Sequence, residues 1–268
     1  MDFILLLLAY LALGAAAGLS AGLLGVGGGL IMVPGLYWIL THQGVTDGAM
    51  HIAIATSMAV IIPTGIMSAR AHHKRGGVDW SLWRRWVPGS VIGVIIGTLT
   101  VSNMDTESLR IFFGFALLSM AGLLLWTPHE GDHKKIPEHP AAMLPLGALI
   151  GVIAAMAGIG GATLSVPIMR WMGRPLKRAI GTASALGIAI AAPACVMYLM
   201  LAPEGYVTAP WVVGSVHLKA AACLALASMP MAPVGAKLTH TLPVRTVKII
   251  FVCFMVIVSL KLLSEGLL

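Results

Sequence analysis

The sequence predicts an all-α integral membrane protein, a polytopic helical bundle built from two inverted repeats. Three observations support this fold class. The 268 residues are 58% hydrophobic and only 10% charged, with a mean hydropathy of +0.93, whereas soluble domains carry roughly 25% charged residues. The charged residues gather in short stretches that separate long apolar runs. Sequence blocks of the first half recur in the second half in the same order, with the loop charges exchanged.

Eight apolar runs are candidate membrane spans, because a helix of about 17 to 25 residues crosses a bilayer. They are Phe3–Leu24, Ile52–Ala69, Val87–Val101, Leu109–Trp126, Met143–Ala157, Ala179–Leu201, Trp211–Met229 and Val247–Leu263, of which the third and fifth are short. A secretory signal peptide needs a basic segment before its apolar run. Asp2 is the only charged residue before the first run, so we expect this run to stay in the mature protein.

Two glycine-rich segments interrupt the apolar pattern at equivalent places. The segment GLLGVGGGLIMVP ends at Pro34, and AMAGIGGATLSVP ends at Pro167. They do not follow the dinucleotide-binding pattern G-x-G-x-x-G, whose third glycine would fall at Leu30. Only about 11 apolar residues follow the first cluster, which is roughly 16 Å of helix and half a membrane. We therefore predict that each cluster separates a long helix, which enters the membrane, from a short, re-entrant-like helix, which comes back out.

Two further matches extend the duplication. The block AIATS resembles AIGTA, and the block from Gly97 to Phe113 resembles the block from Gly235 to Phe251. The chain is therefore predicted to contain a first transmembrane repeat (residues 1–130), an inter-repeat linker (131–137) and a second transmembrane repeat (138–268). Each repeat should hold one broken helix pair followed by three spans.

The charges of the loops predict how each half inserts, because lysine and arginine near span ends favour the cytoplasm. Loop 41–49 contains no lysine or arginine, and its counterpart 170–178 contains four; loop 70–86 contains five, and its counterpart 202–210 contains none. The two halves should therefore lie upside down relative to each other, as in inverted-repeat transporters. Segments 70–86, 127–140, 170–178 and 230–246 are predicted to be cytoplasmic, with both termini outside.

The two helix breaks are the candidate substrate site. A helix that starts inside the membrane presents unpaired N–H groups and a partial positive charge, which bind anions without a buried lysine or arginine. The candidate residues are Gly27, Gly28, Gly29 and Leu30 in the first break and Gly160, Gly161, Ala162, Thr163 and Ser165 in the second. The hydroxyls of Thr163 and Ser165 occur in the second break alone, so the predicted site is asymmetric. Other glycines recur every fourth residue, for example Gly14, Gly18 and Gly22, and this spacing is typical of tight helix packing.

Five polar residues in the following spans are further candidates. Thr56, Ser57 and Thr182 can supply hydroxyl donors to a substrate, or can bond back to their own helices. His51 and Lys177 occupy equivalent positions, where they can attract an anion or can serve as interfacial helix-end residues. Both interpretations are open for each of them.

The linker offers an alternative function. His129, His133 and His139 stand among acidic residues, and histidine with carboxylate suits divalent transition metals. A divalent metal-ion permease is therefore the alternative to an anion transporter, although a solvated linker explains the same residues. Cys195, Cys223 and Cys253 show no zinc-site spacing, so no metal site or cofactor is predicted.

The segments GVGGGLIMVP, HIAIATS, GIGGATLSVP and KRAIGTAS, arranged in two similar halves, resemble the sulfite exporter TauE/SafE family of membrane transporters. The resemblance covers essentially the whole chain, and Ala162 in place of a third glycine is a mild departure. It implies a secondary transporter of a small sulfur-containing anion, such as sulfite, sulfoacetate or a related organosulfonate, with export as the expected direction. The expected location is the cytoplasmic (inner) membrane.

The expected partners are a small anionic substrate and the lipid bilayer, with a homodimer left open. The net charge of +7 does not indicate nucleic acid, because the basic residues lie in loops between spans. We identify no catalytic constellation within the spans and do not expect an enzyme.

Overall fold

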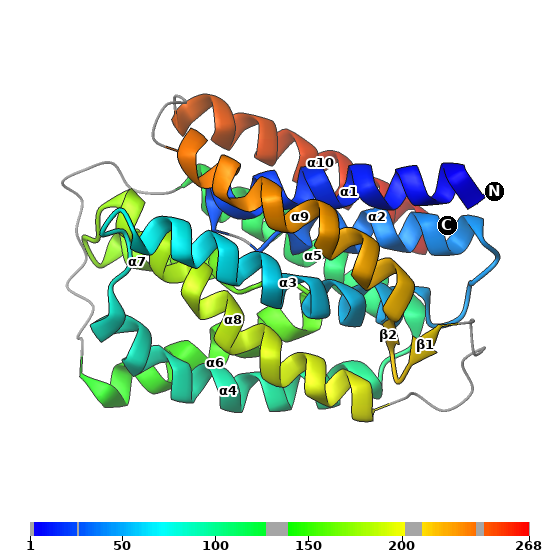
Figure 1. Ribbon diagram of the computed structural model, residues 1–268. Coiled ribbons are helices and arrows are strands. Elements are labelled where there is room, and N and C mark those ends of the chain that lie inside the picture. Colours follow the sequence, from blue (N-terminus) through cyan, green and yellow to red (C-terminus); the bar gives the residue numbers. More distant parts are fainter. Residues whose placement is uncertain (1–2, 26, 127–138, 202–210, 240–243, 268) are drawn as a thin grey trace.

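The computed structural model describes residues 3–25, 27–126, 139–201, 211–239 and 244–267. These residues form ten helices and one short hairpin (Figure 1). The first half contains α1 (Phe3–Leu24), α2 (Gly29–His42), α3 (Ala49–His73), α4 (Trp80–Ser102) and α5 (Thr106–Leu125). The second half contains α6 (Pro140–Ala157), α7 (Ala162–Trp171), α8 (Leu176–Met200), strands β1 (Val212–Val213) and β2 (Val216–His217), α9 (Leu218–Leu238) and α10 (Val244–Leu267). Six of the described helices are long and apolar enough to cross a membrane, which confirms a polytopic all-α membrane protein.

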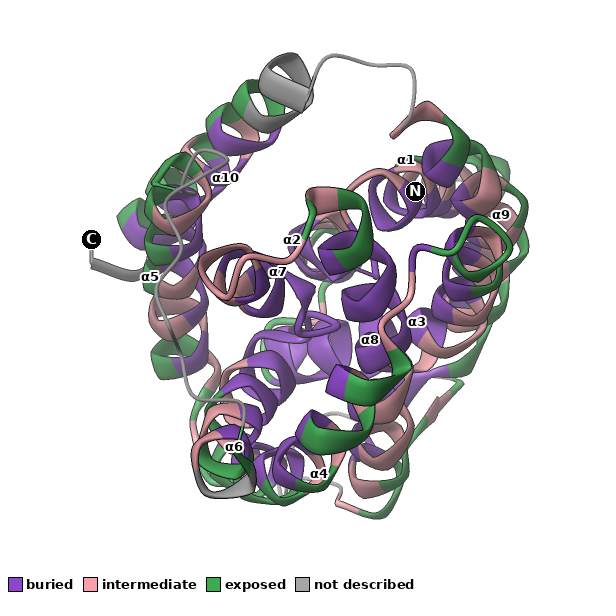
Figure 2. Ribbon diagram, turned by 90° about the vertical axis from the view of Figure 1, so that its left-hand side faces the viewer, coloured by how far each residue is buried: buried purple, intermediate pink, exposed green. Residues whose placement is uncertain are grey.

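The predicted short returning helices are present. After each glycine cluster the chain forms a helix of 14 residues (α2) or 10 residues (α7), too short to cross a bilayer. Figure 2 shows α2, α7 and α8 in the middle of the bundle and mostly buried, with α1, α9, α4, α6, α5 and α10 around them. The broken helices therefore lie inside the protein rather than against lipid.

One predicted span begins in the wrong place. The apolar run from Trp211 was expected to be helical, but β1 and β2 pair there as an antiparallel hairpin, with Val212 opposite His217, and α9 begins at Leu218. Trp211 and Gly214 have φ angles of +75° and +59°, which a right-handed helix cannot contain. The side chain of His217 then caps α9 by accepting the N–H of Ala220 at 3.2 Å.

The glycines spaced by four pack helices of opposite halves together, as their spacing predicts. Helix α1 runs along α9, and α4 runs along α6. A Cβ atom added at Gly14, Gly18 or Gly22 of α1 would lie within 3 Å of backbone atoms of α9. The same holds for the glycines of α4 and α6, Gly89, Gly93, Gly97, Gly147 and Gly151. The backbones of the paired helices therefore approach each other closely along both seams.

Equivalent helices of the two halves pack antiparallel. Between α3 and α8, Gly65 lies against Ile188 while Ser68 bonds to Ser184, so residue numbers rise on one helix as they fall on the other. Between α5 and α10, the Ser259 hydroxyl donates to the Gly114 carbonyl at 2.7 Å, and Arg110 reaches Glu265. An inverted duplication requires the equivalent helices of its two halves to run in opposite directions. The inversion itself and the repeat boundaries remain predictions, and the linker lies outside the described residues.

Candidate functional site

Glycines in the left-handed region of backbone conformation make both helix breaks. The φ angles are +73° at Gly27 and +84° at Gly28 in the first break, and +65° at Gly158 and +74° at Gly161 in the second. Other L-residues rarely adopt these angles. Gly28 and Gly161 are the residues that immediately precede α2 and α7. The glycines thus end one helix and reset the chain direction for the next.

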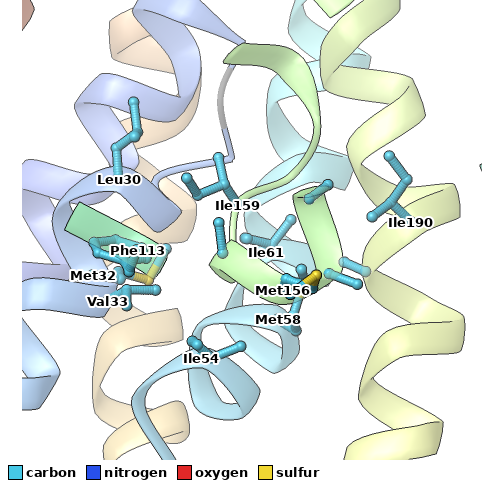
Figure 3. Close-up of a cluster of buried hydrophobic side chains, with 14 of the residues drawn as sticks. Leu30, Met32, Val33, Ile54, Met58, Ile61, Phe113, Met156, Ile159 and Ile190 are labelled. Atoms are coloured by element: carbon cyan, nitrogen blue, oxygen red, sulfur yellow. The ribbon is translucent and has the colours of Figure 1, made fainter. Parts of the chain in front are cut away.

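The two breaks touch each other in the interior of the bundle. A Cβ atom on Gly29 would collide with the Gly158 carbonyl oxygen, and one on Gly27 would lie 3.6 Å from the Gly160 Cα atom. Figure 3 shows Leu30 and Ile159 side by side at this contact. The structure therefore brings together the two glycine motifs that the sequence singles out.

Each short helix begins with N–H groups that have no acceptor within the helix. The first regular bonds are made by the Met32 N–H to the Gly28 carbonyl and by the Ser165 N–H to the Gly161 carbonyl, both at 3.0 Å. The Ile31 N–H also donates to the Gly28 carbonyl, at 3.1 Å, whereas the N–H groups at the very start of each helix lack an intrahelical partner by geometry. Both helix N-termini, with their partial positive charges, therefore lie at the contact between the halves.

Two hydroxyls of α7 lack partners although they are buried. Thr163 is 6% exposed and Ser165 is fully buried, and neither hydroxyl has a hydrogen-bond partner among the described residues. Leaving such a group unpaired costs about 1–3 kcal/mol, so a ligand that pairs with it gains that much. Residues two apart on a helix lie about 200° apart around its axis. Thr163 and Ser165 therefore face different sides of α7, and they cannot bind one small ligand side by side.

Close packing surrounds the breaks in this conformation. A Cβ atom on Gly28 would lie 2.6 Å from the Ala17 carbonyl oxygen, and one on Gly27 would lie 3.0 Å from Ile61. Apolar side chains, including Met32 and Ile61, enclose the contact (Figure 3). The residues of the breaks are thus buried among close-packed apolar side chains.

Ser57 is the one candidate of α3 that reaches a break. Its hydroxyl lies 2.8 Å from the Gly158 carbonyl oxygen and 2.7 Å from the Ile54 carbonyl oxygen. The proton of this hydroxyl is therefore used within the protein. Ser57 holds α3 against the second break.

Thr56 and Thr182 make the same contact in opposite halves. The Thr56 hydroxyl oxygen accepts the N–H of His217, which caps α9, at 3.0 Å. The Thr182 hydroxyl oxygen accepts the N–H of Asp79, which caps α4, at 2.8 Å. Each threonine therefore fixes the start of a helix from the other half. Their hydroxyl protons are not used in these two bonds and stay available as donors.

His51 and Lys177 lie in the first turns of α3 and α8, far from each other. The His51 Nε2 atom lies 3.1 Å from the Val101 carbonyl oxygen and 3.0 Å from the Met104 carbonyl oxygen, where α4 ends. Lys177 is exposed in the first turn of α8. Because α3 and α8 run antiparallel, these two first turns lie at opposite ends of the bundle. The two residues therefore cannot act as one site.

Sequence reasoning missed a symmetric pair that satisfies the ends of α1 and α6. The His72 Nε2 atom lies 3.0 Å from the Gly22 carbonyl oxygen, and the Tyr198 hydroxyl donates to the Ala155 carbonyl at 2.9 Å. Each contact lies just before a break, where helix-end carbonyls have no intrahelical partner. Extending the two aligned blocks would have paired His72 with Tyr198 and Gly22 with Ala155.

Two catalytic patterns were also overlooked. Residues Gly18 to Gly22 match the hydrolase pattern G-x-S-x-G. Ser20 lies within the continuous helix α1, however, and donates to the Ala17 carbonyl at 2.7 Å, whereas a nucleophilic serine needs a strand-to-helix turn. The linker segment His129 to His133 matches H-E-x-x-H, but it lies outside the described residues. Of the three histidines behind the metal interpretation of the linker, the structure describes His139, which is exposed. The described part of the chain contains no cluster of metal-ligating side chains.

The comparisons with known proteins agree with this architecture. Residues 10–262 match the family model of the sulfite exporter TauE/SafE. A probable membrane transporter protein of Haemophilus influenzae is 30% identical over 94% of this chain and 96% of its own length. Similar proteins named probable membrane transporters occur in Methanocaldococcus jannaschii (25% identical, 98% of this chain and 97% of the relative) and Bacillus subtilis (27%, 99% and 99%). No solved structure matches the chain.

Proposed function

From the premise that the chain belongs to the sulfite exporter TauE/SafE family of membrane transporters, we propose that it is a secondary transporter that exports a small sulfur-containing anion by alternating access. The proposed substrates are sulfite, sulfoacetate and related organosulfonates. The observation that carries this proposal is the contact between two helix N-termini, one from each half, beside two buried hydroxyls without partners. The proposed binding groups are the N–H groups at Gly28–Leu30 and at Ala162 and Thr163, together with the Thr163 or Ser165 hydroxyl; the Gly161 N–H already donates to the Ile159 carbonyl.

This arrangement suits an oxyanion better than a cation. A helix N-terminus stabilises a negative charge by about 0.3–1 kcal/mol, and by up to about 2 kcal/mol in partly buried geometries. Each hydrogen bond to a charged group adds about 1.5–3 kcal/mol. A sulfite or sulfonate group has three oxygens, which can accept N–H and O–H donors from two directions. No fixed positive charge is then needed at the centre, and the anion can leave without breaking a strong ion pair.

Transport requires the breaks to open toward one side at a time. At the predicted cytoplasmic end, the α3–α4 turn lies on the α7–α8 turn, with Arg174 Nε 3.4 Å from Asp79 Oδ2 and the Asp79 N–H bonded to Thr182. At the other end, Thr56 holds the start of α9. We propose that these two contacts between the halves separate alternately. No Walker P-loop motif is present in the sequence, so an ion gradient or the anion gradient is the proposed driving force.

Substitution of the unpaired hydroxyls tests the site. Thr163→Val and Ser165→Ala remove hydroxyls that have no partner among the described residues, so the unfolding temperature of the purified, ligand-free protein should stay the same or rise. Thr64→Val is the matched control, because the buried Thr64 hydroxyl is bonded to Ser228 at 2.6 Å. Its loss should lower the stability by about 1–3 kcal/mol.

Ligand-dependent stability then reports binding. Sulfoacetate at about one hundred times its Kd should stabilise the wild type and Thr64→Val by about 2.7 kcal/mol. At least one of the two α7 variants should lose most of this gain, and should lose uptake of sulfite and sulfoacetate in proteoliposomes. Full ligand stabilisation in both α7 variants would contradict the proposed site. Uptake of nickel, and of no sulfur anion, would favour the metal-permease alternative.

A further inference from the structure

A second group of nitrogen donors lies at the far end of α2, away from the helix breaks. The Arg110 guanidinium of α5 donates through Nη1 to the Tyr37 hydroxyl at 3.1 Å and through Nη2 to the Glu265 carbonyl of α10 at 2.6 Å. The Lys261 ammonium of α10 lies 4.4 Å from the centre of the Trp38 ring. Three helices thus bring two cations and two aromatic rings together. Helix α2 lies in the middle of the bundle, and α5 and α10 pack against each other at its side (Figure 2).

Two donors of this cluster are buried without an acceptor. The Arg110 Nε atom and the Trp38 Nε1 atom have no hydrogen-bond partner among the described residues. Within the same part of the chain, neither Arg110 nor Lys261 forms an ion pair with a carboxylate. The Tyr37 and Glu265 contacts orient the guanidinium but leave its charge uncompensated. Buried N–H donors beside uncompensated cations are the groups that an oxyanion pairs with.

The position of the cluster connects it with the helix breaks. Tyr37 and Trp38 lie eight and nine residues beyond the start of α2 at Gly29, which is about 12–14 Å along the helix. Arg110 lies in the first turns of α5, and Lys261 lies in the last turns of α10. The loop charges predict that these helix ends face the non-cytoplasmic side. The short helix α2 therefore has the proposed transport site at its start and the cluster near its end.

We propose that Arg110, Trp38 and Lys261 form an outer binding site for the transported oxyanion, which the anion occupies after it leaves the helix breaks for the non-cytoplasmic side. The inference rests on the proposed function, since it takes the same sulfite or sulfonate group as ligand. The Arg110 Nε–H and the Trp38 indole N–H donate to two oxygens of the anion, and the exposed Lys261 ammonium adds charge from the aqueous side. Glu107, three residues before Arg110, and Glu265, whose backbone carbonyl accepts from Arg110, are exposed acidic residues of these two helix ends, and their negative charges favour release over tight binding.

A purely structural role is the competing explanation for the same residues. Arginine can tie three helices together, and a lysine near a helix end extends to the membrane surface while its stem packs on apolar groups. Trp38→Phe separates the two roles, because phenylalanine keeps an aromatic ring beside Lys261 while it removes the N–H donor together with part of the ring system. A structural cluster tolerates this change, whereas an anion site loses one of its donors.

Indole N–H resonances provide a direct readout of binding. The protein contains seven tryptophans, and ¹⁵N-tryptophan labelling with Trp38→Phe assigns the Trp38 signal in nanodiscs of neutral lipid. Titration with sodium sulfoacetate should move the Trp38 signal saturably. Arg110→Gln and Lys261→Gln should each weaken this titration, about tenfold for the arginine, which is the effect of losing one charged hydrogen bond. Arg75→Gln is the matched control, because Arg75 is exposed and its guanidinium donates to the Ala71 carbonyl of α3, and it should leave the titration unchanged.

Transport measurements separate this inference from the proposed function. If the wild type transports sulfoacetate, Trp38→Phe and Lys261→Gln should raise the apparent KM about three- to tenfold while the unfolding temperature stays unchanged. Wild-type transport with an unmoved Trp38 signal and an unchanged KM would overturn the outer site and leave the proposed function standing. A Trp38 signal that moves only when phosphatidylglycerol is added would also overturn it, in favour of a lipid headgroup. Absence of transport with a saturable Trp38 titration would overturn the proposed function and leave an oxyanion site.

Discussion

Gly161→Ala tests whether the second helix break depends on a residue that tolerates positive φ. Gly161 has a φ angle of +74°, and an alanine in this conformation costs about 1–2 kcal/mol. The added Cβ atom would lie 2.5 Å from the Ile190 Cδ1 atom, so Ile190 must leave its rotamer, at a cost of about 0.5–1.5 kcal/mol. Alanine also lowers the conformational entropy of the unfolded chain, which stabilises the folded state by about 0.4–1 kcal/mol. The net expected loss of stability is about 1–2.5 kcal/mol.

Thermal unfolding of the purified protein in detergent measures this loss. A change of 1 kcal/mol shifts Tm by about 2–4 °C in proteins of this size, so Tm should fall by about 2–10 °C. Gly122→Ala is the control, because a Cβ atom there meets nothing within 4 Å and alanine is favoured over glycine in a helix by about 1 kcal/mol. Its Tm should stay the same or rise. Sulfoacetate should stabilise the control and not Gly161→Ala, since the methyl group lies beside the N–H groups of α7.

Either of two results would refute this reasoning. A Tm of Gly161→Ala at or above the wild-type value would show that the break does not need glycine at this position. Undiminished stabilisation by sulfoacetate would show that the start of α7 does not bind the anion. Gly28 is less suitable for the experiment, because its added Cβ atom would lie 2.6 Å from the Ala17 carbonyl oxygen, which is backbone and cannot rotate aside.

Four further outcomes are expected. Lys177→Cys in a variant without the native cysteines should be labelled from the cytoplasmic side, and labelling from outside would exclude the inverted arrangement. Gly18→Ala should lower the folding yield and cost about 1–3 kcal/mol or more, because its Cβ atom would overlap the backbone of Ser228 in α9; wild-type Tm would contradict the close seam. Thr182→Val should cost about 1–3 kcal/mol by leaving the Asp79 N–H without its acceptor, measured as Tm against the wild type. Burial lowers the pKa of His217 below its ordinary value, and the charge of Lys219 acts in the same direction. As the pH is lowered from about 7 to 5, His217 therefore takes up a proton in the unfolded chain before it does so in the folded protein, and Tm should fall. His217→Asn keeps a capping side chain and should remove that part of the pH dependence.

The spans were predictable because hydropathy depends on composition and length alone. The first predicted run, Phe3–Leu24, coincides with α1. Helix α4 begins at Trp80, before the predicted Val87, because Arg84 and Arg85 end the apolar run without ending the helix. The prediction of a helix beginning at Trp211 was wrong for a related reason. A short apolar segment is compatible with strand as well as helix, and positive φ at a tryptophan has no signature in the sequence.

The helix breaks were predictable, whereas their contacts were not. Clustered glycines followed by a short apolar run indicate a broken helix locally, and Gly28 and Gly161 have the expected positive φ. The roles of Thr56 and Thr182 depend on helices α9 and α4, which come from the other half. The opposite locations of His51 and Lys177 follow from the antiparallel packing of α3 and α8. Such pairings arise only when the halves assemble, so a pattern within one half cannot predict them.

The seam between α1 and α9 has a consequence for biosynthesis. Gly18 of α1 meets Ser228 of α9, which the ribosome adds about 210 residues later. At about 5–20 residues per second, the glycine face of α1 waits on the order of 10–40 s in the lipid before its partner is made. Each half thus completes its packing with a helix encoded by the other. A protein of one such half could complete the same contacts only as an antiparallel pair of copies inserted in both orientations.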